Sequence, residues 1–331
     1  MKRAAIARHE AAPLARRHRP RVIRRGRRAL RQVRDTLLAV VVLAVTALLR
    51  LAPLRGALAL SGGLTGAIAP LLGKLWRLAD AHLALAFPET PPEARRAIAR
   101  EAFANVGRSF AEIAKFASLR GELERYVSID GLEHLQGALA QGKGVLAVTG
   151  HIGNWELLAA YCAGIGLPVD VIGRRPDNAL LSRLLVTTRA RGGVTTILRD
   201  TPQAGRAILK TLRANRILAL LIDQDTRGPR VFVPFFGRLA GTPSGVATLA
   251  LRTGAPVVAL FISRRPEGGH VIRVLPPFAP ADPARDDAES LTAAYTKVIE
   301  AHVREHPEEW VWWHRRWRRR PAASSAIPPI S

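Results

Sequence analysis

From Gly131 onward, short apolar runs rich in β-branched residues alternate with segments of helical periodicity. This alternation is typical of a mostly parallel sheet whose two faces are covered by helices. It predicts strands over 145–149, 168–172, 194–198, 217–222, 256–263 and 270–275, with helices over 131–141, 154–164, 177–191, 202–214, 243–252 and 287–305. We therefore expect an α/β fold, a mostly parallel sheet flanked by helices.

The N-terminal region is strongly basic. Of the chain's formal charge of +24, the first 79 residues contribute 17 basic and only two acidic residues. Residues 1–35 form an arginine-rich arm, and self-repulsion predicts that this arm is disordered. Such an arm favours binding to a polyanion, and the three candidates are an anionic membrane, a nucleic acid and an acidic protein.

An uncharged apolar run follows the arm, over Thr36–Leu49. Its 14 residues are fewer than the roughly 20 that a bilayer span requires, although apolar residues continue to Leu54 beyond Arg50. We expect an N-terminal membrane anchor that either spans the bilayer or lies in its plane. A second apolar stretch, 56–73, packs into the protein or lies on the membrane surface. The predicted division is an anchor region over 36–75, a catalytic domain over 76–321 and a short tail over 322–331.

One strand-to-helix turn carries the most chemistry. The strand 145–149 is followed by Gly150, His151 and Gly153, and the next helix begins after Asn154, a good N-cap, with Glu156 in its first turn. Ligands bind at the carboxyl ends of strands in open α/β sheets. We expect Glu156 to fold back on His151 and to orient it as a general base. The alternative is a histidine that serves packing alone.

A second polar group ends the strand 217–222. Asp223 and Asp225 form an Asp-x-Asp pair, which resembles the metal-binding motif of many glycosyltransferases. Two aspartates at a turn are also common turn chemistry. Read by itself, this pair keeps a metal-dependent glycosyltransferase as an alternative.

Taken together, these segments resemble the bacterial lipid A acyltransferases that add lauroyl or myristoyl chains, a branch of the glycerolipid acyltransferases with a His-x4-Asp/Glu motif. The motif is Gly150–Glu156, and further matches are Arg-Pro-Asp-Asn at 175–178, Val-Phe-Val-Pro-Phe-Phe-Gly at 231–237, and a Trp- and Arg-rich segment over 310–321. The resemblance covers about residues 36–321.

The resemblance implies a role for particular residues. His151 would be the catalytic base with Glu156 as its partner, and Arg189 (or Arg191 in its place) and Asp223 would position the substrate or support the site. Arginine side chains suit a phosphorylated sugar because they bind phosphate bidentately. The remaining substrate-binding residues implied in this way are Arg175, Asn178, Arg315 and Arg316.

The resemblance also implies the reaction. An acyl chain passes from an acyl carrier protein thioester to a hydroxyl of a lipid A precursor, without a metal or another cofactor, on the cytoplasmic face of the bacterial inner membrane. Phosphatidylinositol mannosides are the alternative acceptors, since enzymes that acylate them share the motif. Nucleic acid is not expected as a partner, because the sequence carries no RRM, KH or helix-turn-helix signature.

Overall fold

A computed structural model describes residues 21–119, 121–176 and 178–321. By its internal contacts the chain divides into two compact units, residues 1–43 and residues 44–331. Helix α1 (Arg21–Leu51) begins in the first unit and ends in the second. The sequence predicted that the arm over residues 1–35 is disordered. Its residues 21–35 are helical in the structure and form the first turns of α1. Residues 1–20 of that arm and the tail 322–331 lie outside the described residues.

The apolar part of α1 is longer than the uncharged run indicates. Gln32–Leu51 is 20 residues long and apolar enough to cross a membrane. The charged residues of this segment are Arg34, Asp35 and Arg50, near its two ends. Length and composition therefore allow this segment to act as the expected anchor.

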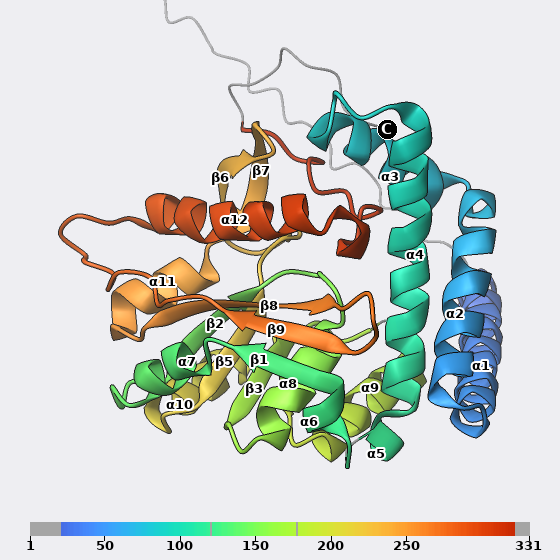
Figure 1. Cartoon of the computed structure of the whole chain (residues 1–331), viewed down its shortest axis with the longest axis horizontal. Helices are drawn as coiled ribbons and strands as arrows, with labels where there is room; N and C mark the ends of the chain where they lie inside the picture. Colours follow the sequence, from blue (N-terminus) through green and yellow to red (C-terminus); the bar gives the residue numbers. More distant parts are fainter. Residues whose placement is uncertain (1–20, 120, 177, 322–331) are drawn as a thin grey trace, which may run out of the picture. The chain divides into compact units, whose positions relative to one another are not determined.

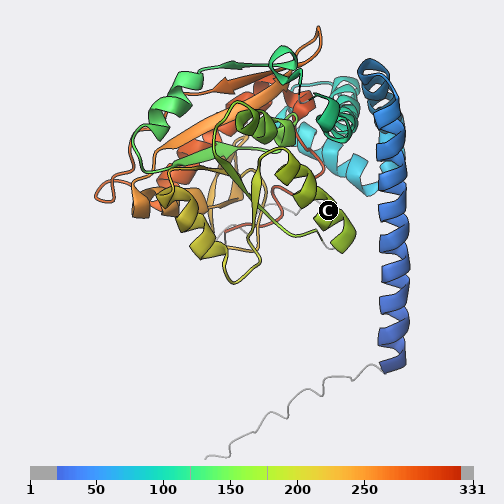
Figure 2. The same cartoon turned by 90° about the horizontal axis from the view of Figure 1, so that it is seen from below.

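A seven-stranded sheet forms the centre of the second unit, in the order β1-β9-β8-β2-β5-β3-β4. Neighbouring strands are parallel except for β8 and β9. The strands are β1 (Val127–Asp130), β2 (Val145–Thr149), β3 (Val169–Gly173), β4 (Thr195–Leu198), β5 (Ile217–Leu221), β8 (Val257–Arg264) and β9 (His270–Val274). Figures 1 and 2 show helices on both faces of this sheet, which confirms the predicted α/β fold.

Two apolar cores lie on the two faces of the sheet. Alternate residues of β2 divide between them: Val145 and Ala147 face one core, and Leu146 and Val148 face the other. Figure 1 shows α7 and α8 on the first face and α11 and α12 on the second. The helices that follow the strands are α7 (Leu132–Leu139), α8 (Trp155–Gly164), α9 (Ala179–Arg191), α10 (Ala204–Arg213), α11 (Gly245–Thr253) and α12 (Ala288–Glu305).

Two β elements of the structure were not predicted from the sequence. The first is β1, at the edge of the sheet. The second is an antiparallel hairpin of β6 (Arg230–Phe235) and β7 (Arg238–Pro243), which lies between the predicted strand 217–222 and the predicted helix 243–252. Pro234 within β6 weakens the strand signal, and a two-stranded hairpin tolerates it because it has free edges.

Helices from the N-terminal part of the second unit pack beside the sheet. They are α2 (Leu54–Ile68), the short η1 (Ala69–Leu72), α3 (Lys74–Ala86) and α4 (Pro92–Ala114), followed by α5 (Phe116–Leu119) and α6 (Leu123–Tyr126). Glycines allow α2 and α4 to approach closely: a Cβ added at Gly107 of α4 would lie 2.5 Å from the carbonyl oxygen of Ser61. Residues 54–75, predicted as part of the anchor region, therefore pack within the second unit.

Candidate active site

The register of two central strands brings a histidine and an aspartate together. β2 and β5 are parallel neighbours, with Thr149 opposite Leu221. His151 and Asp223 each come two residues later, so both lie beyond the carboxyl end of the sheet at the same level. His151 Nδ1 is 2.8 Å from Asp223 Oδ1, and the backbone N–H of His151 donates to Oδ2 at 2.7 Å.

The environment of Asp223 fixes its charge and the tautomer of His151. Burial by itself raises the pKa of Asp223, but the imidazole of His151 and hydrogen bonds from His151 and Trp310 outweigh it and lower the pKa to about 2. The Trp310 indole donates to Oδ2 at 2.8 Å. An ionised carboxylate only accepts hydrogen bonds, so the proton between the two residues belongs to Nδ1. In the neutral ring of His151, Nε2 is then the nitrogen that carries the lone pair, as a general base requires.

The turn that carries His151 is held by the C-terminal segment. Ile152 forms an isolated antiparallel bridge with Trp310, and the N–H of Val311 donates to the carbonyl of His151 at 3.3 Å. Gly153 has a φ of +57°, and a Cβ there would lie 2.1 Å from the carbonyl oxygen of Ile262. Only glycine fits this position, which explains one of the two glycines at the turn.

Asn154 caps α8 as expected, and it also joins the turn to a buried ionic network. Its Oδ1 accepts from the N–H of Leu157 at 3.1 Å, while Nδ2 donates to Glu112 Oε2 at 2.8 Å. Glu112 lies on α4 and also accepts hydrogen bonds from Arg264, His270 and Tyr126.

The charge of Glu112 follows from these partners. Its side chain is fully buried. Burial raises the pKa of Glu112, but His270 and Arg264 more than compensate and hold it well below its usual value. A buried carboxylate with several donors is costly to disturb. Through Asn154, this network fixes the start of α8, four residues after His151.

Glu156 does not have the partner that the sequence predicted. Within the described residues, its carboxylate contacts Arg189, which donates from Nε at 2.7 Å and from Nη2 at 2.5 Å. The bidentate pair uses both oxygens of Glu156, and Asp223 takes its place on His151. The prediction that Glu156 orients His151 is therefore wrong, and the carboxylate that contacts the His151 ring in the structure is Asp223. Arg189 rather than Arg191 is the arginine at this site, because Arg191 is exposed.

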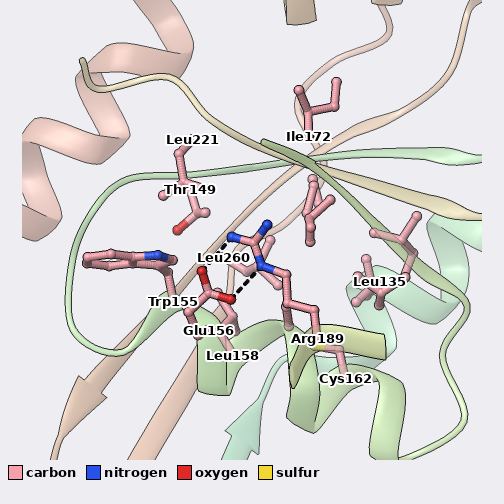
Figure 3. Close-up of a pocket in the computed structure, with 16 residues that line it drawn as sticks. Leu135, Thr149, Trp155, Glu156, Leu158, Cys162, Ile172, Arg189, Leu221 and Leu260 are labelled. Atoms are coloured by element: carbon pink, nitrogen blue, oxygen red, sulfur yellow. Dashed lines mark hydrogen bonds and ion pairs between the residues drawn. The ribbon is translucent and has the colours of Figure 1, made fainter. Parts of the chain in front are cut away.

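The Glu156–Arg189 pair borders a narrow apolar cavity of about 40 Å³ on the α8 face of the sheet. Figure 3 shows the pair with Leu135, Leu158 and Leu260 among the surrounding side chains. Cys162 also lines the cavity and is buried. Trp155 and Arg189 line both this cavity and the cleft at His151. The cavity therefore adjoins the cleft that His151 lines.

The cleft at His151 has a volume of about 520 Å³ and leads into a basic basin of about 470 Å³. Arg174, Arg199 and His314 line both spaces. Burial lowers the pKa of His314 to about 4, so its ring is neutral at pH 7. We call the second space the arginine basin; its arginines are Arg174, Arg199, Arg227, Arg315, Arg318 and Arg319.

The other predicted substrate-binding residues have different positions. Arg315 lines the arginine basin. Arg316 is completely buried, donates to the carbonyl of Gly241 and to Thr242 Oγ1, and lies over the ring of Phe235. It therefore connects the C-terminal segment to the hairpin, and the prediction that it binds substrate is wrong.

Asn178 and Arg175 also lie away from the cleft lining. Asn178 caps α9, accepting from the N–H groups of Leu180 and Leu181. Arg175 is exposed and lies 3.9 Å from Asp200. The segment 175–178 therefore leads into α9, and the neighbouring Arg174 is the arginine of this stretch that lines the cleft.

Both aspartates of the Asp-x-Asp pair form hydrogen bonds or ion pairs with other side chains of the protein. Asp223 accepts from His151 and Trp310, and Asp225 pairs with Arg319 at 3.0 Å. These contacts differ from the arrangement expected of a metal- and nucleotide-binding Asp-x-Asp pair, whose oxygens must be available to the cation.

Three site residues were not singled out from the sequence: Trp310, His314 and Glu112. Trp310 and His314 belong to the Trp- and Arg-rich segment that the resemblance singled out, so the segment was known but not the role of these two residues. The contacts of Trp310 with Asp223 and of His314 with the backbone N–H of Asp225 depend on the tertiary fold. Glu112 gave only the signal of a carboxylate between the apolar residues Ala111 and Ile113.

Comparison with known proteins identifies the family. Residues 25–319 match the model of the bacterial lipid A biosynthesis acyltransferases. The chain is 32% identical to a lipid A biosynthesis lauroyltransferase of Escherichia coli K12, over 74% of this chain and 79% of that protein. It is 28% identical to a palmitoleoyltransferase of lipid A biosynthesis from the same organism, over 79% and 85%.

A third relative differs in its acceptor. The chain is 26% identical to a phosphatidylinositol mannoside acyltransferase of Mycolicibacterium smegmatis, over 71% of this chain and 77% of that protein. The family match covers the strands, the His151 turn and the C-terminal segment alike. The chain is an acyltransferase, and it belongs to the bacterial lipid A biosynthesis acyltransferase family.

Proposed function

We propose that this acyltransferase moves a fatty acyl chain from an acyl carrier protein thioester to a hydroxyl of a lipid A precursor at the inner membrane. The observation that carries the proposal is the His151–Asp223 pair at the mouth of the cleft. A hydroxyl attacks a thioester only when a base removes its proton, and no protein nucleophile is needed if the acceptor brings the hydroxyl.

In this mechanism Nε2 of His151 takes the proton of the acceptor hydroxyl as its oxygen attacks the thioester carbonyl. Asp223 stabilises the resulting imidazolium, as the acid does in a catalytic triad. The tetrahedral intermediate then collapses, the carbon–sulfur bond breaks, and the imidazolium returns its proton to the leaving thiolate. The N-terminal end of α8, which starts at Trp155, supports the oxyanion with its amide dipoles.

The adjoining spaces suit the two ends of the substrates. The apolar cavity beside Trp155 is a candidate entrance for the acyl chain, whose hydrocarbon requires an apolar lining. The arginine basin favours a phosphorylated acceptor, because guanidinium groups bind phosphate bidentately. The same positive charge suits an acidic carrier protein during docking. The proposal requires no metal, so activity is expected to survive EDTA.

The direct test uses the full-length purified chain with acyl carrier protein thioester and lipid A precursor, with the product identified by mass spectrometry. We expect one added acyl chain with wild-type protein and none with His151→Ala, while His151→Ala still binds membranes. Transfer by His151→Ala at nearly the wild-type rate would refute the mechanism. Mass spectrometry of lipid A from cells with and without the protein tests the acceptor in vivo.

A phosphatidylinositol mannoside is the second candidate acceptor, which the mycobacterial relative supports. Both acceptors are anionic glycolipids with free hydroxyls, so the arginine basin suits either. The same assay with each acceptor in turn distinguishes them, because the preferred acceptor should give the higher kcat/KM.

A further inference from the structure

We infer that α2, η1 and α3 present a second membrane contact, separate from the apolar segment of α1, and that it lies in the headgroup region of an anionic leaflet. The contact is a row of exposed apolar side chains that we call the α2–α3 ridge: Leu60, Leu64, Ile68, Leu71, Leu72 and Leu75. The proposal rests on the proposed lipid acceptor for its purpose, but its test is independent of acyl transfer.

The ridge is unusual in its exposure. Leu71 is 82% exposed, Leu60 65% and Leu64 58%. Their spacing of four and seven residues places them on one stripe of the helical segment. Large contiguous apolar patches are rare on the free surface of a soluble protein and mark a contact with a partner or a membrane.

The opposite side of α2 is committed to the protein. Gly62 and Gly66 are buried, and a Cβ at Gly66 would lie 3.3 Å from Ala104 of α4. Figure 1 shows α2 on the side of α4 that faces away from the sheet. The ridge is thus the outer face of a helix whose inner face is already packed.

The same packing argues against a membrane span. α2 with η1 and α3 are together apolar enough to be a broken span, but they bend by 91° at Gly73. α3 buries Leu83 and His82, and His82 Nδ1 lies 2.7 Å from the carbonyl of Trp312. A helix pair with one face inside the protein can lie on a bilayer but cannot be surrounded by its hydrocarbon.

Charge favours an anionic lipid surface as the occupant. Arg55, Lys74 and Arg77 are exposed beside the ridge, and no acidic residue occurs between Asp35 and Asp80. Apolar side chains with a cationic border are the pattern of a helix that lies in the membrane interface.

The ridge continues from the end of α1. Residues 44–51 of α1 belong to the second unit, where Leu49 is buried against Ala57. The buried ammonium of Lys115 donates to the carbonyls of Arg50 at 3.0 Å and Ala52 at 2.7 Å, which satisfies the C-terminal end of the helix. The end of α1 is therefore fixed in the second unit, just before α2 begins at Leu54.

Aromatic contacts connect the ridge to the arginine basin. Trp76, next to Leu75, has its ring centroid 6.4 Å from that of Phe103, and Phe103 stacks on Trp313 at 3.9 Å. Trp313 lines the basin. A ridge in the headgroup region places the basin close to the same level, where a phosphorylated lipid would reach it with little displacement from the bilayer.

The test measures depth in vesicles of phosphatidylcholine and phosphatidylglycerol that contain the full-length chain. An environment-sensitive fluorophore is placed on Leu71→Cys and, as a matched control, on Glu133→Cys, whose native side chain is 75% exposed on α7. Cys162→Ala serves as the background. We expect a blue-shifted emission at position 71, quenched by lipids brominated near the headgroup, and an aqueous emission at position 133.

Three results would overturn the inference. An aqueous emission at position 71 would leave the ridge in solvent, quenching only by lipids brominated at the end of the acyl chain would indicate a span, and disulfide crosslinking between two copies of the unlabelled Leu71→Cys variant would indicate a dimer. Any of these together with normal acyl transfer would leave the proposed function intact. A shallow position with no acyl transfer to any acceptor would refute only the proposed function.

A double variant gives the functional readout. Leu64→Glu with Leu71→Glu should lower transfer to acceptor embedded in vesicles about tenfold, but change transfer to detergent-dispersed acceptor by less than about twofold. Leu239→Glu, at an exposed leucine of β7, is the control and should change neither. Equal losses in vesicles and in detergent would contradict the inference.

Discussion

Asp223 holds His151 at two points, accepting from its backbone N–H and lying 2.8 Å from its Nδ1, although 72 positions separate them in the sequence. This relationship follows from the pairing of β2 with β5, since each residue comes two positions after paired strand ends. The position of the imidazole is therefore a property of the sheet itself. Catalytic groups held by neighbouring strands are placed more rigidly than groups on a loop.

Removal of the Asp223 charge should abolish most of the activity. Asp223→Asn keeps the size of the side chain but loses the charge that stabilises the imidazolium and fixes its tautomer. We expect kcat to fall about 10³- to 10⁴-fold, measured by single-turnover transfer from the thioester. Asp200→Asn, at an exposed aspartate, is the control. More than a tenth of wild-type kcat in Asp223→Asn would contradict the assignment.

The Glu156–Arg189 pair should behave as a coupled unit. Both side chains are only 15% exposed, so Arg189→Met leaves a carboxylate without its partner in a largely buried place. We expect a loss of roughly 3 kcal/mol or more in the free energy of unfolding. The double variant Glu156→Leu with Arg189→Met should recover much of that loss, as measured by denaturant unfolding in detergent. Strictly additive losses would show that the pair is not coupled.

Two adjacent arginines should fail in different ways. Arg316→Met removes a fully buried guanidinium that donates to Gly241 and Thr242, so it should lower the stability by about 2–4 kcal/mol. Arg315→Ala, in the arginine basin, should raise KM for a phosphorylated acceptor with little change in melting temperature. Melting curves and acceptor titrations separate the two effects. A raised KM with unchanged stability in Arg316→Met, and a loss of stability with unchanged KM in Arg315→Ala, would contradict the assignment and indicate that Arg316 binds substrate.

Glu112 should matter for the site although it lies outside the cleft. Glu112→Gln replaces one acceptor oxygen by a donor among Arg264, His270 and Asn154. We expect a loss of about 3 kcal/mol in stability and, in protein that remains folded, a lower kcat with KM nearly unchanged, because the turn at His151 loses its support. Glu133→Gln on α7 controls for loss of a surface charge. Unchanged stability and kcat would exclude the network from any positioning role.

Glu309 should lower the stability of the protein as pH rises from about 4.5 to 7. Burial raises the pKa of Glu309 from 4.5 to about 7 in the folded state. Between these values the folded state binds more protons than the unfolded state, so the free energy of unfolding contributed by this group decreases as pH rises from about 4.5 to 7. Glu309→Gln removes this contribution. The stability difference between variant and wild type should therefore shift in favour of the variant by about 2–3 kcal/mol between pH 5 and pH 8, and a pH-independent difference would contradict the assignment.

The fold followed from the sequence because its signals are local. Apolar runs such as Val145–Thr149 and caps such as Asn154 and Asn178 act within a few residues, so each strand that was predicted is present and in the predicted order. The hairpin of β6 and β7 was missed, because Pro234 and Gly237 read as loop residues.

The site was only partly predictable for a different reason. His151, Asp223 and Arg189 were predicted to be site residues. Which strand lies beside β2 in the sheet, however, cannot be predicted from local sequence signals. A nearby glutamate was therefore the natural partner for His151, whereas the sheet supplies Asp223 and α9 supplies Arg189 to Glu156. The burial of Arg316 is equally a tertiary property, since its neighbour Arg315 has the same chemistry and lines the arginine basin.

The most direct test of this account is an NMR measurement of the His151 ring in protein labelled with ¹⁵N-histidine. A hydrogen bond to an ionised carboxylate gives Nδ1–H a downfield, slowly exchanging proton signal, and His151→Gln assigns that signal. We predict that Asp223→Asn removes the signal and that Glu156→Gln retains it. A signal that survives Asp223→Asn and disappears in Glu156→Gln would contradict the account.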